Sequence, residues 1–141
     1  MKVVRALTKT LYQFNLSTHE KQSFTNLDNY LEQALFESGV KEGILTVYCP
    51  HTTGAITINE NADPDVKTDL KLGLNQTFPN KAEYVHFEGN SDGHMKSSVV
   101  GASETLIISN GKLILGTWQS VYFCEFDGPR ERTFYVKIIQ G

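Results

Sequence analysis

The segment from Tyr84 to Lys96 concentrates side chains that bind metal ions or move protons. It reads Tyr-Val-His-Phe-Glu-Gly-Asn-Ser-Asp-Gly-His-Met-Lys and holds His86 and His94, half of the four histidines of the chain. Imidazole and carboxylate groups are common ligands of divalent cations, and histidine changes its charge near neutral pH. Glycines on both sides of Asn90-Ser91-Asp92 let the backbone bend and approach a ligand closely. The segment therefore indicates a metal- or proton-handling site, although a polar surface loop without a ligand has a similar composition.

A second histidine motif, Pro50-His51-Thr52-Thr53-Gly54, extends this hypothesis. We expect His51, His86 and His94 to converge on a divalent metal ion, because three protein ligands with an open position describe a catalytic site. His86 and His94 are too far apart in sequence for one helical face, so the glycine-containing loop must fold them together. The alternative is that one or more of the three is a structural histidine held by hydrogen bonds.

Carboxylates in the same segment suggest a different way to hold a cation. Glu88 and Asp92 offer oxygen ligands to magnesium, which prefers carboxylates, water and substrate phosphates, or they orient the histidines from behind. Solvated loop acids explain Glu88 equally well. Asp92 is the stronger candidate, since it lies two residues before His94. Zinc and magnesium therefore both stay open as the cofactor.

Positive charge is needed wherever a phosphate group is bound. Lys96 and Arg130 are the candidates, and the planar guanidinium of Arg130 suits a bidentate phosphate contact. Arg132 is expected on a strand surface instead.

Further polar residues are candidates for contacts with a substrate. Asn59, Glu60 and Asn61 bind a ring or anchor the neighbouring turn, and Asn90 lies between the two glycines of the loop. Cys49 and Cys124 are most simply buried strand residues. Cys124 lies close to Arg130 in sequence, so a place for it in the site stays open as a minor alternative.

The hydrophobic pattern predicts the elements that position these groups. Apolar residues at three- and four-residue spacing predict a helix over residues 27–38, capped by Thr25 or Asn26 and ended by Gly39. A second helix begins with Asp63 as cap and Pro64 at the first position, and Pro79 closes it. Strands are expected within residues 2–16, over 43–48 and 55–59, and on both sides of the turn Asn110-Gly111. The remaining expected elements are a short helix over 94–100 that ends at Gly101 and a meander of strands over 105–109, 112–115, 116–126 and 132–139.

Size and composition limit the classes of protein to consider. The 141 residues are 40% hydrophobic and 21% charged, which is typical of one folded domain. A net charge of −3 and a pI near 5.8 argue against a general nucleic-acid binder. The sequence contains no apolar run of about 18 residues and no secretory signal, so we expect no membrane span. Two cysteines without a CxxC pair favour a reduced, cytoplasmic setting.

Three motifs together resemble one known family. They are Pro-His-Thr-Thr-Gly-Ala-Ile-Thr-Ile-Asn-Glu-Asn-Ala-Asp-Pro-Asp-Val over 50–66, His-Phe-Glu-Gly-Asn-Ser-Asp-Gly-His-Met-Lys-Ser-Ser over 86–98 and Leu-Gly-Thr-Trp-Gln-Ser-Val-Tyr-Phe-Cys-Glu-Phe-Asp-Gly-Pro-Arg over 115–130. In this order they closely resemble the YjbQ-like family, also called the secondary thiamine-phosphate synthase family, over nearly the whole chain. Gly93 stands where alanine is usual in that family, and Gly54 where alanine is common. We expect both changes to loosen the loop while leaving the chemistry in place.

The resemblance implies a fold, an assembly and an activity. The fold is a single α+β domain over residues 1–141, mostly an antiparallel β-sandwich with two or three helices, assembled as a homotrimer. The activity is that of a thiamine-phosphate synthase, a transferase that joins a pyrimidine diphosphate to a thiazole phosphate with release of pyrophosphate. We therefore expect a small metal-dependent enzyme for a phosphorylated metabolite, with residues from two chains completing each pocket. The alternatives are a metal-assisted hydrolase of a small phosphorylated substrate and a non-catalytic trimer that binds an anionic metabolite.

Overall fold

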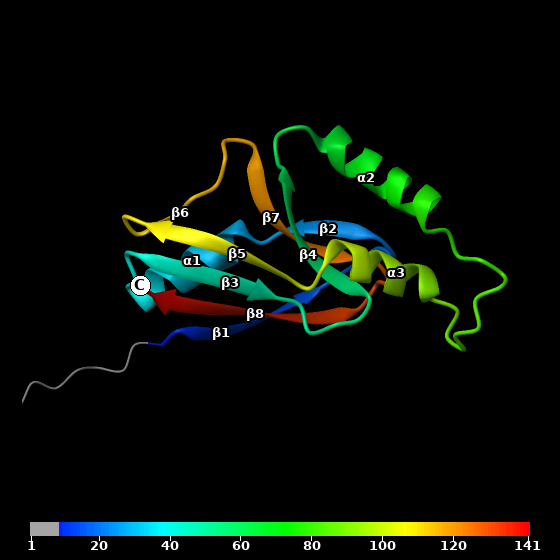
Figure 1. Cartoon of the computed structure of the whole chain (residues 1–141), viewed down its shortest axis with the longest axis horizontal. Helices are drawn as coiled ribbons and strands as arrows, with labels where there is room; N and C mark the ends of the chain where they lie inside the picture. Colours follow the sequence, from blue (N-terminus) through cyan, green and yellow to red (C-terminus); the bar gives the residue numbers. More distant parts are fainter. Residues whose placement is uncertain (1–8) are drawn as a thin grey trace, which may run out of the picture.

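Two antiparallel sheets and three helices make up the computed structural model, which describes residues 9–141 (Figure 1). One sheet has the strand order β1-β8-β3-β5-β6 and the other the order β2-β7-β4. The strands are β1 (Leu11–Ser17), β2 (Ser23–Asn26), β3 (Gly43–Tyr48), β4 (Gly54–Glu60), β5 (Ser103–Ser109), β6 (Lys112–Leu113), β7 (Gln119–Glu125) and β8 (Glu131–Gln140). The helices are α1 (Asp28–Ser38), α2 (Pro64–Thr77) and α3 (Ser91–Val100). This architecture confirms the expected α+β class.

The main core lies between the two sheets and α1. Leu31 of α1, Leu45 and Phe134 of the larger sheet, and Phe123 of the smaller sheet are all fully buried in one cluster. Alternating residues of β8 point into this core, as a half-buried strand requires. One apolar cluster shared by both sheets explains why they fold as a unit.

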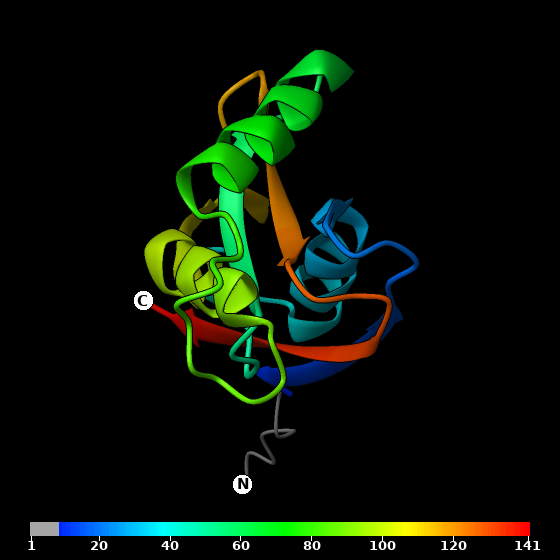
Figure 2. The same cartoon turned by 90° about the vertical axis from the view of Figure 1, so that its right-hand side faces the viewer.

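The end of α1 and the start of α2 follow the expected capping chemistry. The N-cap of α1 is Leu27 and not Thr25 or Asn26, although the Asn26 side chain, one residue before it, accepts a hydrogen bond from the Asp28 N–H at 2.8 Å. Gly39 ends α1 with a left-handed φ of 69°. In the same way, the Asp63 carboxylate accepts from the Asp65 N–H at 2.9 Å, with Pro64 at the first helical position. None of the residues of α2 is buried, and the helix stands out at one end of the molecule (Figure 2). No helix within residues 9–141 is long and apolar enough to cross a membrane.

The expected meander of the last four strands is wrong. Only β5 and β6 form the predicted hairpin, around Asn110 and Gly111 with positive φ values of 52° and 72°. β7 instead pairs with β2 and β4 in the smaller sheet, and β8 inserts between β1 and β3. β7 is buried from Ser120 to Glu125 on both of its faces, so it belongs in the middle of a covered sheet. The part of the first expected strand before Lys9 lies outside the described residues, and β2 was not predicted.

Helix α3 begins at Ser91, three residues earlier than the expected start at His94. Gly93 is therefore inside the helix, where an added Cβ would lie only 2.8 Å from the Phe126 carbonyl oxygen. At Gly54, a Cβ would lie 3.0 Å from the Phe123 ring. The expectation that these glycines loosen a loop is wrong, because both mark places where the chain packs closely against a neighbour.

Candidate functional site

The three histidines of the hypothesis meet at one polar cavity of about 350 Å³. The loop between β3 and β4, the segment that leads into α3 and the start of β8 supply its walls (Figure 1). Its lining residues are Pro50, His51, Thr52, Thr53, His86, Glu88, Asn90, His94, Arg130 and Arg132. Segments far apart in the sequence thus bring their polar side chains to one hollow.

The pair His86 and His94 is the closest contact between histidines of the cavity. Their ring centroids lie 5.1 Å apart with the planes at 88°. His94 sits in the first turn of α3, while His86 lies in the preceding loop, where its carbonyl accepts a hydrogen bond from the Gly89 N–H at 3.1 Å. Gly89 has a φ of 73°, which turns the chain toward the helix. The expectation that this loop folds the two histidines together is confirmed.

His51 is held in one tautomer by the backbone of β8. Its Nε2 accepts a hydrogen bond from the Thr133 N–H at 3.0 Å. A neutral imidazole has a single lone pair, so Nδ1 must carry the ring proton. Burial of the ring lowers the pKa of His51, and the positive charge of Arg132 acts in the same direction. His51 is therefore a neutral side chain that offers an Nδ1–H donor.

These contacts limit how the cavity can hold a cation. Within residues 9–141, no three histidine, cysteine, aspartate or glutamate side chains lie close enough to share a metal ion. The lone pair of His51 is also engaged with Thr133, so a three-histidine zinc centre does not fit this arrangement. Glu88 supplies a carboxylate to the cavity, and magnesium needs only one or two such protein ligands when substrate phosphates provide the others. The donor set therefore suits magnesium better than zinc, and metal binding itself stays a prediction.

A buried ion pair forms the wall behind the cavity. Arg132 donates through Nε to Glu125 Oε2 at 2.6 Å and through Nη2 to Glu125 Oε1 and to Thr53 Oγ1, the last at 2.9 Å. The side chains of Arg132 and Glu125 are only 4% and 0% exposed. The placement of Arg132 on a strand surface is wrong, because it shares the inward face of β8 with Phe134. This alternation is the signal in the sequence that could have indicated its burial.

Arg130 is fixed at the mouth of the cavity by Asp127, a residue that the sequence interpretation missed. Arg130 Nη2 donates to Asp127 Oδ2 at 2.8 Å, and Asn90 Nδ2 donates to the same oxygen at 2.7 Å. Burial alone would raise the pKa of Asp127, but the hydrogen bonds from Asn90 and Arg130 outweigh it and hold that pKa below its usual value. The Arg130 side chain is still 48% exposed, so part of its guanidinium remains open to a ligand. Asp127 follows the buried strand β7 by two residues, which is the pattern that could have identified it.

Two of the charged candidates lie outside the cavity lining. Lys96 is 2% exposed and donates to Asn75 Oδ1 of α2 at 2.5 Å and to Gln22 Oε1 at 3.3 Å. Asp92 is also buried and pairs with Lys21 at 3.5 Å. Burial lowers the pKa of the Lys96 ammonium group, while the Asp92 charge opposes that shift. In this structure the two residues connect α3 to the neighbouring elements and do not line the cavity with His94.

The substrate-binding candidates on β4 and β7 are also separate from the histidines. Asn59, Glu60 and Asn61 lie at the far end of β4 from Gly54, roughly 20 Å away at about 3.3 Å per residue. There Asn61 Nδ2 donates a hydrogen bond to Ser120 Oγ at 2.9 Å, so Asn61 anchors the neighbouring turn, as the alternative interpretation of these residues expected. Cys124 is fully buried, and burial raises the pKa of its thiol. Besides the three histidines and Arg130, the candidates that the structure places in the cavity are therefore Glu88 and Asn90.

The fold and the cavity define a small α+β protein with a polar, histidine-containing site at one end of a two-sheet core. Residues 12–141 match the family described as UPF0047 protein YjbQ-like, and the chain belongs to this family. It is 51% identical to UPF0047 protein MJ1081 of Methanocaldococcus jannaschii, over 93% of this chain and 95% of that protein. It is 49% identical to UPF0047 protein YugU of Bacillus subtilis, over 94% of this chain and 99% of that protein.

A crystal structure of a YjbQ/UPF0047 family protein from Clostridium acetobutylicum has the same fold. It superposes with a TM-score of 0.89 at 52% sequence identity and covers 91% of this chain and 99% of that one. The resemblance inferred from the three motifs is therefore confirmed at the level of family and fold.

Proposed function

We propose that this chain is a small transferase that resembles secondary thiamine-phosphate synthase. In this reaction a pyrimidine diphosphate and a thiazole phosphate are joined and pyrophosphate is released. The observation that supports the proposal is the cavity, in which His51, His86, His94 and Arg130 meet. Its volume of about 350 Å³ is within the range of sites for small metabolites.

The proposed chemistry needs charge stabilisation more than it needs a nucleophile. As the carbon–oxygen bond to the diphosphate breaks, that carbon forms its new bond to the ring nitrogen of the thiazole. The electron pair of the broken bond leaves on pyrophosphate, and negative charge grows on its oxygens. The half-exposed guanidinium of Arg130 and the Nδ1–H of His51 are donors for those oxygens. Because Asp127 and Thr133 already fix both side chains, little reorganisation is needed when the substrate binds.

Magnesium is the cation that we propose for this reaction, carried into the site by the diphosphate substrate. Glu88 is the carboxylate of the cavity lining and would hold it together with substrate oxygens. The ion would supply additional positive charge to the leaving group.

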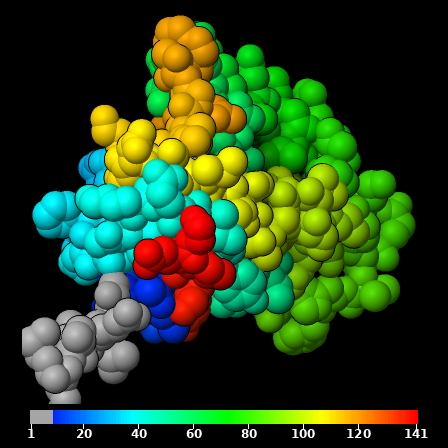
Figure 3. All heavy atoms as spheres, turned by 60° about the vertical axis from the view of Figure 1, so that its left-hand side comes forward, coloured from blue at the N-terminus to red at the C-terminus, as the bar shows by residue number. Residues whose placement is uncertain are grey.

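A homotrimer is the assembly that we propose for the active protein. The histidine cavity lies near the Gly54 end of β4, whereas the candidates Asn59, Glu60 and Asn61 lie at its other end. Beside Asn61, the segment between β6 and β7 projects from the surface (orange in Figure 3), and its Trp118 side chain is 62% exposed. Ile44 is also paired with Ile107 and Ile139 in a row across three strands, each of them 38% to 58% exposed. Exposed apolar rows of this kind mark interfaces. In a trimer, the Trp118 end of one copy would close the histidine cavity of the next.

The reduced state of the thiols supports a cytoplasmic location as part of the same proposal. Cys49 and Cys124 are both free and buried.

Pyrophosphate release with the two thiamine precursors and magnesium tests the proposed reaction. We expect the wild-type protein to release pyrophosphate only when both precursors are present. We also expect Arg130→Gln to lower the rate by about 10²-fold, as loss of one charge-stabilising donor does, while the exposed-surface control Lys137→Gln keeps the wild-type rate. Phosphate release from a single precursor would support the hydrolase instead. A thermal shift by phosphate ligands without turnover would support the non-catalytic trimer.

A further inference from the structure

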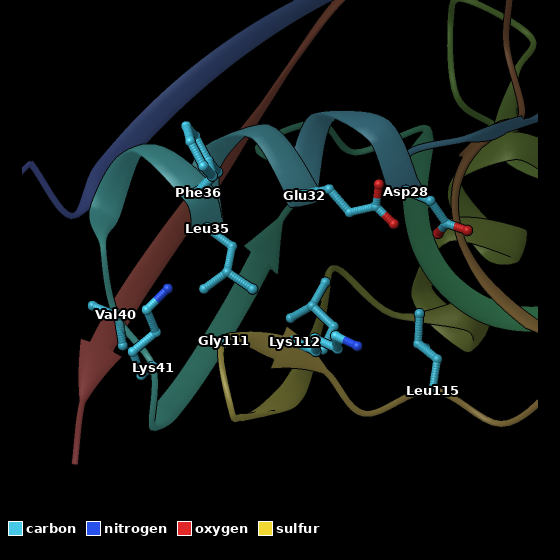
Figure 4. A pocket seen from close by; sticks show the side chains of 10 residues that line it. Asp28, Glu32, Leu35, Phe36, Val40, Lys41, Gly111, Lys112 and Leu115 are labelled. Carbon is cyan, nitrogen blue, oxygen red and sulfur yellow. The ribbon is translucent and has the colours of Figure 1, made fainter.

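A second cavity, of about 540 Å³, lies between α1 and the β5–β6 hairpin (Figure 4). It shares no lining residue with the histidine cavity. One wall comes from α1 and the turn that follows it, and the other from the hairpin and the segment after it. Its lining residues are Asp28, Glu32, Leu35, Phe36, Val40, Lys41, Gly111, Lys112, Leu113 and Leu115. The volume is suitable for a drug-sized molecule.

The floor of this cavity is apolar and continuous with the main core. Leu35 and Val40 are each 5% exposed and belong to the buried core cluster, and Leu113 and Leu115 pack against that cluster. In Figure 4 the Leu35 side chain points from α1 toward the hairpin. An apolar body placed here would cover the partly exposed Leu113 and Leu115, and its binding would be favoured by the hydrophobic effect.

The hairpin holds one of the two lysines of the cavity in position. The Gly111 N–H donates to the Lys41 carbonyl at 3.0 Å. Gly111 has a φ of 72°, and a Cβ there would lie 3.1 Å from Lys41 Cδ, so the lysine stem runs across the turn. The turn geometry therefore requires glycine and leaves room for the Lys41 stem beside the cavity.

The basic side chains that line the cavity have no partners among the described residues, whereas one of its two acidic side chains is hydrogen-bonded. Within residues 9–141, neither the Lys41 nor the Lys112 ammonium group makes an ion pair or a side-chain hydrogen bond. The Asp28 carboxylate, in contrast, is occupied by hydrogen bonds from Ser120 Oγ at 2.6 Å and from the Val121 N–H at 3.0 Å. Glu32 is the acidic group left on the α1 wall. A ligand with one negative charge fits the lysines, whereas a polyanion would meet the acidic wall.

We propose that this cavity binds a small amphiphilic monoanion, with an aromatic or branched aliphatic body on the leucine floor and one carboxylate or sulfonate toward which the side chains of Lys41 and Lys112 can turn. The site is separate from the proposed transferase cavity. It therefore goes beyond the proposed function, and the two proposals can fail independently.

The direct test is a titration of the isotope-labelled protein with naphthalene-1-sulfonate, followed by amide chemical shifts. The Gly111 amide, in its tight turn, is the reporter for the site. We expect saturable shifts at Gly111 and Leu113, and about tenfold weaker binding in Lys41→Glu/Lys112→Glu, since the reversal replaces weak surface attraction with repulsion. Lys41→Gln/Lys112→Gln tests the same charges with a smaller change. The control Lys81→Glu/Lys137→Glu carries the same change of net charge on exposed residues elsewhere and should bind as the wild type does.

The neutral compound naphthalene-1-methanol separates the contribution of charge from that of the apolar body. We expect it to bind more weakly than the sulfonate and to respond little to the lysine variants. Equal affinities of the wild type and both Lys41/Lys112 variants for the sulfonate would overturn the proposal. Chemical-shift changes that map to α2 or to the exposed residues Ile44, Ile107 and Ile139, and not to the hairpin, would also overturn it.

Discussion

Removing Glu125 should destabilise the protein strongly, because it leaves the Arg132 guanidinium buried without its counter-charge. Both side chains are almost fully buried, and Glu125 also accepts hydrogen bonds from Thr18 Oγ1 and the Asp127 N–H, each at 2.9 Å. Breaking one side of a buried ion pair costs about 3–5 kcal/mol. For a domain of this size, a loss of that order lowers the melting temperature by roughly 6–20 °C. We expect Glu125→Leu to show a loss in this range.

Urea denaturation followed by circular dichroism measures the effect, and the double variant provides its control. Glu125→Leu/Arg132→Met removes both charges, so most of the lost stability should return, since apolar replacement of a whole buried pair is often neutral. If Glu125→Leu costs less than about 1 kcal/mol, the pair is in contact with water in solution, as measured surface pairs are. If the double variant is as unstable as the single one, the cost comes from packing and hydrogen bonds, and the electrostatic reasoning is refuted.

Four further predictions concern His51, helix α2 and the assembly. In ¹⁵N-labelled protein, the His51 ring should show the Nδ1–H tautomer that its bond to Thr133 requires, and a dominant Nε2–H form would contradict the hydrogen bond. Burial lowers the pKa of His51 in the folded state, so its contribution to stability is fully present above the unfolded pKa of about 6.5. That contribution is lost as the pH falls from there through the folded pKa. We therefore expect the free energy of unfolding to depend less on pH in this range in His51→Gln than in the wild type. Gly73→Ala in α2, where an added Cβ meets nothing within 4 Å, should stabilise the protein by about 0.5–1 kcal/mol in the same denaturation assay, and destabilisation would show that α2 is covered in solution. Sedimentation should give a trimer for the wild type and for Phe36→Glu but monomers for Trp118→Glu, and a fully active wild-type monomer would disprove the assembly.

Local chemistry made the helices and one hairpin predictable from the sequence. Gly39 ends α1, Asp63 and Pro64 start α2, and Asn110-Gly111 closes the β5–β6 hairpin. In each case the residues that decide the conformation are neighbours in the chain, so the signal is contained in a short window.

Long-range pairing is what the sequence did not reveal. β2 has four residues and little alternation, and its place in the fold depends on β7, almost a hundred positions later. The even spacing of Arg132 and Phe134 indicates a shared face, but only the partner Glu125, on another strand, makes burial of that arginine possible. Lys96 is a similar case, since Asn75 and Gln22 occupy its ammonium group from two other segments.

The convergence of the histidines was predictable, whereas their roles were not. The motifs around His51 and His94 pointed to one site, and the structure brings them to one cavity. The hydrogen bond from the Thr133 N–H occupies the Nε2 lone pair of His51, so this ring can donate through Nδ1 but not bind a metal through Nε2. No local sequence pattern predicts a contact between positions so far apart in the chain.

A structure determined with magnesium and pyrophosphate tests the central claim most directly. The account predicts pyrophosphate in the histidine cavity, in contact with Arg130 and beside His86 and His94, and Glu88 would hold the magnesium ion that accompanies it. Pyrophosphate bound only elsewhere at saturating concentration, without contact to Arg130, would contradict it.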